Sequence, residues 1–283
     1  MSPGVFLAVM FAAFLHAAWN AAIKRGGAKL TAMLILTLVQ GGAGLVVALS
    51  RPWPAAEVVP WLLVSGAFHA SYKLFLAFAY ERGDLSRVYP IARGAAPMVV
   101  VLISAAVLSD AIASWEYVGI FVLGIGILTM ARGVFSSGES LRLVPLALGS
   151  AAMTAGYSLV DGLGARVSGD AMMYVGWLFV LDAMLYTPIC IALRGPSVLR
   201  ASGRSWALGS AAAAASYSAY AIAVWAMTQA PIAVVAALRE TSILFAVLIG
   251  WLAFGETLGR QKALAAGLII AGVVLTRFQP AWF

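Results

Sequence analysis

Apolar blocks long enough to cross a bilayer recur along nearly the whole chain. About twenty apolar residues in a helix span the roughly 30 Å of hydrocarbon in a membrane. With 63% hydrophobic and 10% charged residues, the chain has too little polar sequence to cover a soluble surface. We therefore expect an all-α integral membrane protein. Ten transmembrane helices are predicted, at about residues 4–23, 30–50, 58–80, 86–108, 115–132, 143–164, 171–193, 205–228, 231–254 and 261–278.

The basic residues gather in the loops on one side of the predicted bilayer. The loops after the first, third, fifth, seventh and ninth spans carry Lys24, Arg25, Lys29, Arg82, Arg87, Arg132, Arg142, Arg194, Arg200, Arg204, Arg260 and Lys262, and the other side carries Arg51, Arg166 and Arg277. Because cytoplasmic loops are enriched in Lys and Arg, we predict that both termini lie outside the cytoplasm, in a protein of the cytoplasmic (inner) membrane. The net charge of +7 thus comes from loops whose basic residues orient the protein in the membrane, and no nucleic-acid partner is expected.

The chain matches itself at a shift of 146 positions, which lays residues 77–131 over 223–277 without a gap. Arg93 then falls on Arg239 and Gly126 on Gly272. We interpret this as a duplication, with a first repeat at residues 1–138 and a second at 139–283. Since each repeat holds five predicted helices, an odd number, the second must enter the membrane inverted. Inverted repeats are typical of secondary transporters, whose binding site lies at the repeat interface.

Other sequence features predict packing and exclude some chemistry. Small residues four apart, at Ala263, Gly267 and Ala271, predict a close helix contact, although an Ala-rich chain also produces such runs by chance. The single Cys190 cannot form an intrachain disulfide, and no Cys/His cluster has the spacing of metal ligands. No cofactor or metal is therefore predicted.

Ionisable residues inside the spans are the strongest candidates for function, because a charge at the bilayer centre costs about 2.5–3.5 kcal/mol without a partner or a cavity. His16, His69 and Asp182 lie near mid-membrane in the predicted spans. Lys73 follows His69 by one helical turn, on the same face, with Tyr72 beside it.

Arg93 and Arg239 are the leading candidates for holding a substrate head group. A guanidinium binds a carboxylate or phosphonate through two parallel hydrogen bonds, which Lys cannot reproduce. The alternative is that both long side chains extend back to the membrane surface. Asp182 and Glu240 are the available counter-charges, and either one would neutralise Lys73. The excess of basic groups indicates an anionic or zwitterionic solute.

Proton coupling is a second role for these groups, with His16, His69, Asp182 and Glu240 as candidates. A histidine hydrogen-bonded to a neighbouring helix is the alternative. Asp161 lies close to the end of the sixth span, where we expect a solvated or capped carboxylate. Aromatic and amide side chains are expected to line the pathway or to pack between helices, at Trp19, Asn20 and Tyr157.

Several runs look like those of a known family. They are His16, Trp19, Asn20 and Lys24 in the first span, residues 79–97 before and within the fourth, Tyr157, Ser158, Asp161 and Gly164 in the sixth, and Leu238, Arg239, Glu240, Thr241 and Ser242 in the ninth, followed by Gly255 and Glu256. With these residues the chain resembles the EamA-type members of the drug/metabolite transporter superfamily, over essentially its whole length. One departure is Ser109 and Asp110, where family members carry a Gly-Glu pair.

The resemblance implies ten helices in two inverted five-helix EamA repeats and alternating access around a central cavity. Together with the intramembrane charges, it gives the predicted substrate-binding residues Arg93, Arg239, Lys73, His69, His16, Trp19, Asn20, Tyr72, Tyr89, Tyr157 and Glu240. We therefore predict a secondary transporter, expected to export a small polar metabolite, with proton or exchange coupling. A flippase for a phosphate-bearing, lipid-linked molecule is the alternative. An enzyme is not expected, because the scattered polar groups have no recognisable catalytic spacing.

Overall fold

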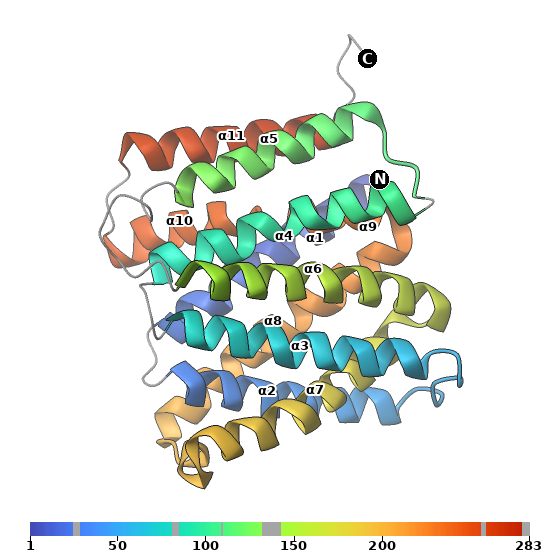
Figure 1. Ribbon diagram of the computed structural model, residues 1–283, viewed down its shortest axis with the longest axis vertical. Helices are drawn as coiled ribbons and strands as arrows, with labels where there is room; N and C mark the ends of the chain where they lie inside the picture. The colour runs from blue at the N-terminus through green and yellow to red at the C-terminus, as the bar shows by residue number, and fades with distance from the viewer. Residues whose placement is uncertain (25–28, 81–84, 109, 132–142, 256–258, 279–283) are drawn as a thin grey trace.

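The computed structural model describes residues 1–24, 29–80, 85–108, 110–131, 143–255 and 259–278. Within these residues the chain forms eleven α-helices and one short 3₁₀ helix, η2 (Figure 1). Their bounds are α1 Pro3–Lys24, α2 Lys29–Leu49, α3 Val59–Tyr80, α4 Leu85–Val107, α5 Ser114–Ala131, α6 Leu143–Ser168, α7 Ala171–Arg194, η2 Pro196–Leu199, α8 Gly203–Gln229, α9 Ile232–Arg239, α10 Ser242–Phe254 and α11 Arg260–Arg277.

The membrane class predicted from the sequence is confirmed. Seven helical segments of the described chain are long and apolar enough to cross a bilayer, in α1, α2, α3, α6, α7, α8 and, as one stretch, Ile232–Ala253. The three other predicted spans fall on α4, α5 and α11. The helix ends follow the predicted spans closely, since long apolar runs set the length of each helix.

The ninth predicted span is not one continuous helix, which corrects the sequence prediction. Glu240 and Thr241 separate α9 from α10, and the backbone there bonds over three residues instead of four: Glu240 N–H to the Ala237 carbonyl at 3.0 Å and Thr241 N–H to the Leu238 carbonyl at 3.1 Å. The Thr241 hydroxyl also donates to the Leu238 carbonyl, at 2.7 Å. A hydroxyl that competes for a helix carbonyl favours such tightened turns.

The helices lie roughly parallel across the view of Figure 1, stacked along the long axis of the molecule. The pair α5 and α11 forms one end of the stack, and α2 and α7 form the other. Between them α1 packs against α8 and α10, while α6 packs against α3 and α4. The middle layers therefore bring α1, α3, α6, α8 and α9 around the centre of the bundle.

Glycines allow a close helix contact between α5 and α11. A Cβ added to Gly272 would lie 2.6 Å from the Leu123 nitrogen, and one added to Gly126 would lie 2.9 Å from the Ile269 nitrogen. Side chains at these positions would collide with backbone, so the helices meet here only because both residues are glycine. The predicted seam at Ala263, Gly267 and Ala271 is wrong: all three are exposed, and a Cβ at Gly267 would meet nothing within 4 Å.

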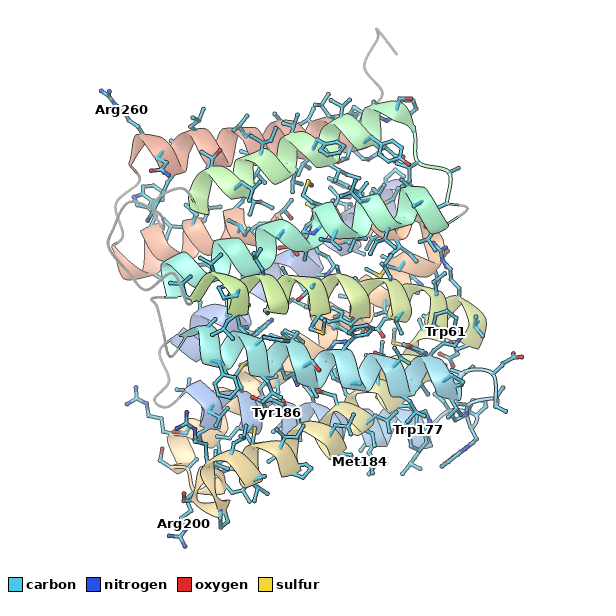
Figure 2. The ribbon with its side chains drawn as sticks, in the orientation of Figure 1. Trp61, Trp177, Met184, Tyr186, Arg200 and Arg260 are labelled. Atoms are coloured by element: carbon cyan, nitrogen blue, oxygen red, sulfur yellow. The ribbon has the colours of Figure 1, made fainter. Side chains whose placement is uncertain are left out.

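Apolar side chains are exposed on the bundle and polar side chains are buried inside it, the arrangement that a membrane protein requires. Large apolar side chains such as Leu7, Val46 and Met184 are exposed. Figure 2 shows Met184 on the outside of the bundle. Arg200 and Arg260 extend from the same end of the bundle in that view. Polar and charged side chains are buried inside, among them Thr37, Gln40, His69, Lys73, Thr154, Asp161, Asp182 and Arg239. Since buried charge is costly in a membrane, these residues are the candidates for a functional site.

Candidate functional site

A polar cavity of about 50 Å³ lies at the centre of the bundle. Its wall combines two cationic side chains, two histidines, aromatic rings and small polar groups from seven helices. The lining residues are His16, Trp19, Asn20, Gln40, His69, Tyr72, Lys73, Leu76, Thr154, Tyr157, Phe179, Ser216, Tyr220 and Arg239. A volume of this size holds a few water molecules, so binding of a metabolite would need the helices to move apart.

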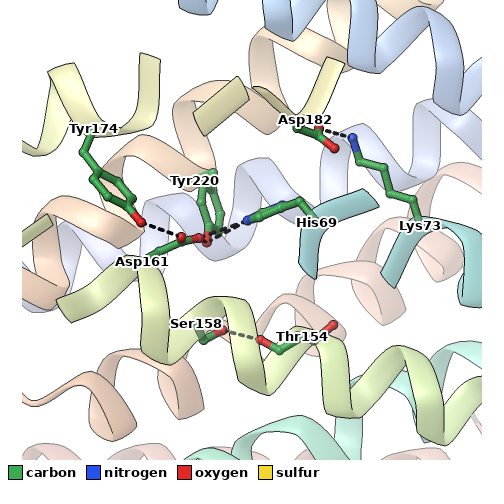
Figure 3. Close-up of polar contacts among 8 residues, drawn as sticks. All are labelled: His69, Lys73, Thr154, Ser158, Asp161, Tyr174, Asp182 and Tyr220. Carbon is green, nitrogen blue, oxygen red and sulfur yellow. Dashed lines mark hydrogen bonds and ion pairs between the residues drawn. The ribbon is translucent and has the colours of Figure 1, made fainter. Parts of the chain in front are cut away.

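A hydrogen-bond cluster centred on the Asp161 carboxylate lies behind one side of this wall (Figure 3). His69 Nε2 lies 3.0 Å from Asp161 Oδ2, and the hydroxyl of Tyr174 donates to Oδ1 at 3.1 Å. Tyr220 also donates its hydroxyl to Oδ2. Asp161 is fully buried, and its partners come from α3, α7 and α8, so this one carboxylate ties four helices together.

The location of Asp161 corrects the expectation of a solvated or capped helix end. The sixth predicted span stopped at residue 164, whereas α6 continues to Ser168, which places Asp161 about two turns inside the helix. Nothing local in the sequence marks the partners, because His69 and Tyr220 lie 92 and 59 residues away along the chain. A buried carboxylate with three donors is satisfied by hydrogen bonds even though its charge is removed from water.

Lys73 is neutralised on the opposite side of His69. Its ammonium group forms an ion pair with Asp182 on α7 and donates to Thr37 Oγ1 on α2 at 2.7 Å. It also lies 5.1 Å from the centre of the Tyr186 ring. Lys73 and Asp182 are 2% and 0% exposed, so the ion pair is buried. The structure thus supports the reading in which Asp182 is the counter-charge of Lys73.

Arg239 stands at the end of α9, where the helix breaks, and reaches the cavity wall. Its side chain is 7% exposed, and its guanidinium carbon lies 5.1 Å from the centre of the Tyr220 ring. No carboxylate in the described part of the chain pairs with it. Extension of Arg239 to the membrane surface is therefore excluded in this structure, and its charge faces the cavity and an aromatic ring.

Aromatic rings fix the remaining geometry of the wall. Tyr157 stacks on His69 with ring centres 4.2 Å apart, and Tyr220 meets the same imidazole edge to face at 5.1 Å. On α1, Trp19 Nε1 donates to His16 Nδ1 at 3.2 Å and the Asn20 amide donates to the His16 carbonyl at 2.7 Å. Such contacts hold both histidines in defined orientations, which positions their ring nitrogens.

The structure brings eight of the predicted site residues to the cavity: His16, Trp19, Asn20, His69, Tyr72, Lys73, Tyr157 and Arg239. Glu240 is buried next to Arg239 but does not line the cavity, and Asp182 lies behind Lys73. Arg93 and Tyr89 belong to α4, but their side chains lie outside the described residues. Sequence reasoning missed the lining residues Gln40, Leu76, Thr154, Phe179, Ser216 and Tyr220.

An ion pair closes one end of the bundle, away from the charged wall. Arg166 donates to both carboxylate oxygens of Asp110, at 2.7 and 3.2 Å, and to the carbonyls of Met227 and Ala230 at the end of α8. Asp110 also accepts from the Ile232 N–H at the start of α9, at 2.9 Å. This pair, the Arg166–Asp110 clasp, therefore links the segment before α5 to α6, α8 and α9. Among the described residues, no group of three His, Cys, Asp or Glu converges to hold a metal ion.

Membrane-crossing helices around a buried, charged cavity define this molecule as a polytopic α-helical membrane protein with an internal polar site. Residues 141–278 match the EamA-like transporter family. This segment, nearly half of the chain, is thus similar to a family of membrane transporters, in agreement with the resemblance found in its residues. The match covers the second of the two predicted repeats.

Solved structures share the fold. Twenty-nine of their chains match this protein. One, described as a crystal structure of a protein, superposes with a TM-score of 0.76 at 19% identity, over 99% of this chain and 100% of its own. None of the curated proteins compared with this chain matches it.

Proposed function

We propose that this protein is a secondary transporter that carries a small anionic or zwitterionic metabolite through the central cavity by alternating access. The match of residues 141–278 to the EamA-like transporter family supports transport of a small molecule. The observation that carries the choice of substrate class is the charge of the wall: Lys73 and Arg239 line it, whereas its described lining contains no carboxylate. Asp182 already neutralises Lys73, so among the described lining residues Arg239 is the cation that remains for a substrate anion.

The arrangement of the helices supports two inverted repeats. If α6 to α11 repeat α1 to α5, with α9 and α10 together equivalent to α4, the contact of α1 with α8 corresponds to that of α6 with α3, and α1 with α10 to α6 with α4. The glycine contacts follow the same rule. Gly126 faces Ile269 and Ala265, and Gly272 faces Leu123 and Gly119, the residues 146 positions earlier.

The two ends of the bundle support an alternating mechanism. The Arg166–Asp110 clasp ties one end, whereas the cavity residues on α1 and α3 lie toward the ends of these helices at Lys24 and Tyr80. Transport requires the clasp end to separate when the other end closes. If both termini lie outside the cytoplasm, as the basic loops predict, the clasp end faces outward in the cytoplasmic membrane. Export is the direction we propose.

A flippase for a lipid-linked phosphate shares the basic cavity but needs a side opening to the bilayer. The described lining comes from α1, α2, α3, α6, α7, α8 and α9, that is, from seven helices of the bundle. Substrate entry along the helix axes, as in a solute transporter, fits a lining shared among so many helices better. The solute remains our first proposal.

Purified protein in proteoliposomes tests the proposal. Counterflow is measured with a labelled pool of amino acids, carboxylates, phosphonates and amines, with and without a pH gradient. We expect saturable exchange of an anionic or zwitterionic member and none of the simple amines. Movement of only a labelled lipid would replace the proposal by the flippase, and exchange of amines alone would contradict the Arg239-centred site.

A further inference from the structure

We propose that His69 and Asp161 form a proton-binding site linked through Tyr220 to Arg239, so that one proton binds as one substrate anion binds. The two ligands would then cross the membrane together. The anion in this inference rests on the proposed function, whereas the proton site rests on the geometry of the buried cluster alone.

The first step is the charge balance at Asp161. Its three described partners are His69, Tyr174 and Tyr220, and no Lys or Arg of the described chain pairs with it. Among these partners only imidazole can carry a positive charge near neutral pH. His69 is therefore the one group in direct contact that can neutralise the carboxylate, and it does so only when it binds a second proton.

The second step is the position of that proton. Asp161 is an acceptor, so the facing His69 Nε2 carries a hydrogen and donates to it at 3.0 Å. The exchangeable proton then binds at Nδ1. His69 lines the cavity, so in this proposal Nδ1 exchanges its proton with cavity water while the Nε2–H···Asp161 bond stays intact.

The third step is the link to the anion site. Tyr220 donates to Asp161 and carries the Arg239 guanidinium over its ring, at 5.1 Å. In the empty cavity the Arg239 charge balances the Asp161 charge across this ring and opposes a second positive charge on His69. A bound anion would cancel the Arg239 charge. The positive charge that compensates the Asp161 carboxylate must then come from a proton bound to His69.

The other charged and titratable groups facing this centre do not replace that proton. Lys73, one turn along α3, is already paired with Asp182. Glu240 lies outside the cavity wall and is engaged in an interaction of its own. The remaining facing groups are His16 on α1, Tyr72 on α3, Tyr157 on α6, Tyr174 and Tyr186 on α7, and Tyr217 and Tyr220 on α8.

The coupling between proton binding and anion binding is reciprocal, so a proton on His69 also strengthens anion binding.

The charge link can be tested before the substrate is known, because the chain contains only two histidines. Protein labelled with ¹⁵N-histidine gives two imidazole signals, and His16→Gln identifies that of His69. Arg239→Gln removes the same charge that an anion would cancel. We expect it to move the midpoint of the His69 titration upward by about one pH unit, which is about tenfold in proton affinity. Arg239→Lys keeps the charge and is the matched control.

Anion probes added to the unmutated protein supply the second arm, which does not depend on how Arg239→Gln folds. Glutamate, succinate and methylphosphonate present the anionic groups that a guanidinium holds. We expect at least one of them to move the His69 midpoint upward as Arg239→Gln does, and Asp161→Asn to abolish this response.

The outcomes separate the two proposals. An unchanged His69 midpoint in folded Arg239→Gln, or in the probe-saturated protein, overturns the proton link even if the probe is transported. A shift in Arg239→Gln without any response to the probes supports the link and counts against these anions as substrates. In proteoliposomes, one proton should accompany each transported probe anion, and His69→Gln should remove the proton flux.

Discussion

Arg239 combines burial with the absence of a described carboxylate partner, so its charge is available to a ligand. Arg239→Ala should abolish counterflow of the anionic probe while membrane insertion and the elution profile stay normal. Arg239→Lys should transport weakly, since a lysine keeps the charge but loses the two-pronged geometry. Unchanged counterflow in Arg239→Ala would remove this residue from the site.

Lys73 and Asp182 show the opposite situation, a buried charge that is already compensated. Asp182→Asn leaves Lys73 with an uncompensated charge and should destabilise the protein by about 3–5 kcal/mol, seen as a lower Tm in detergent. The double variant Lys73→Met/Asp182→Asn should recover most of the loss. Arg51→Gln breaks the more exposed pair with Asp170 and should change stability by only about 1 kcal/mol or less. Equal effects of Asp182→Asn and Arg51→Gln would contradict this account.

Between elements, glycine decides how closely α5 and α11 approach. Gly272→Leu forces a side chain against the Leu123 backbone and should lower the Tm strongly, and Gly126→Leu should do the same against Ile269. Gly267→Leu on the same helix α11 is the matched control, because a Cβ there meets nothing within 4 Å. Thermal unfolding of the three variants gives the comparison. A Tm loss in Gly267→Leu as large as in Gly272→Leu would refute the assigned seam.

For the whole molecule, orientation is the property that links the site to the direction of transport. The basic excess in the loops at one end predicts that both termini lie outside the cytoplasm. An alkaline phosphatase fused after Phe283 should be active outside the inner membrane, and a green fluorescent protein at that position should stay dark. The matched fusion within residues 256–258 should give the opposite pair of signals. A fluorescent C-terminal fusion would reverse the assigned orientation.

Hydropathy predicted the positions of the helices because the thickness of the bilayer sets the length of every span. The cost of charge in the membrane likewise brought His69, Lys73 and Arg239 to notice before any contact was known. The sequence prediction was weaker wherever a local structure depends on contacts with other helices. It missed the break between α9 and α10, it chose exposed positions on α11 for the packing seam, and it treated Asp161 as a helix end.

The sequence by itself thus determined the class of the protein, the extent of its helices and the residue types that function requires, because burial in lipid acts on each segment separately. Only the tertiary structure decided which charges are paired. Asp182 pairs with Lys73, which lies 109 residues away along the chain, and Asp161 binds His69, which lies 92 residues away. Arg239 instead lies over the aromatic ring of Tyr220. Pairing depends on distances between helices that are remote in sequence, and those distances are set by packing of the whole bundle.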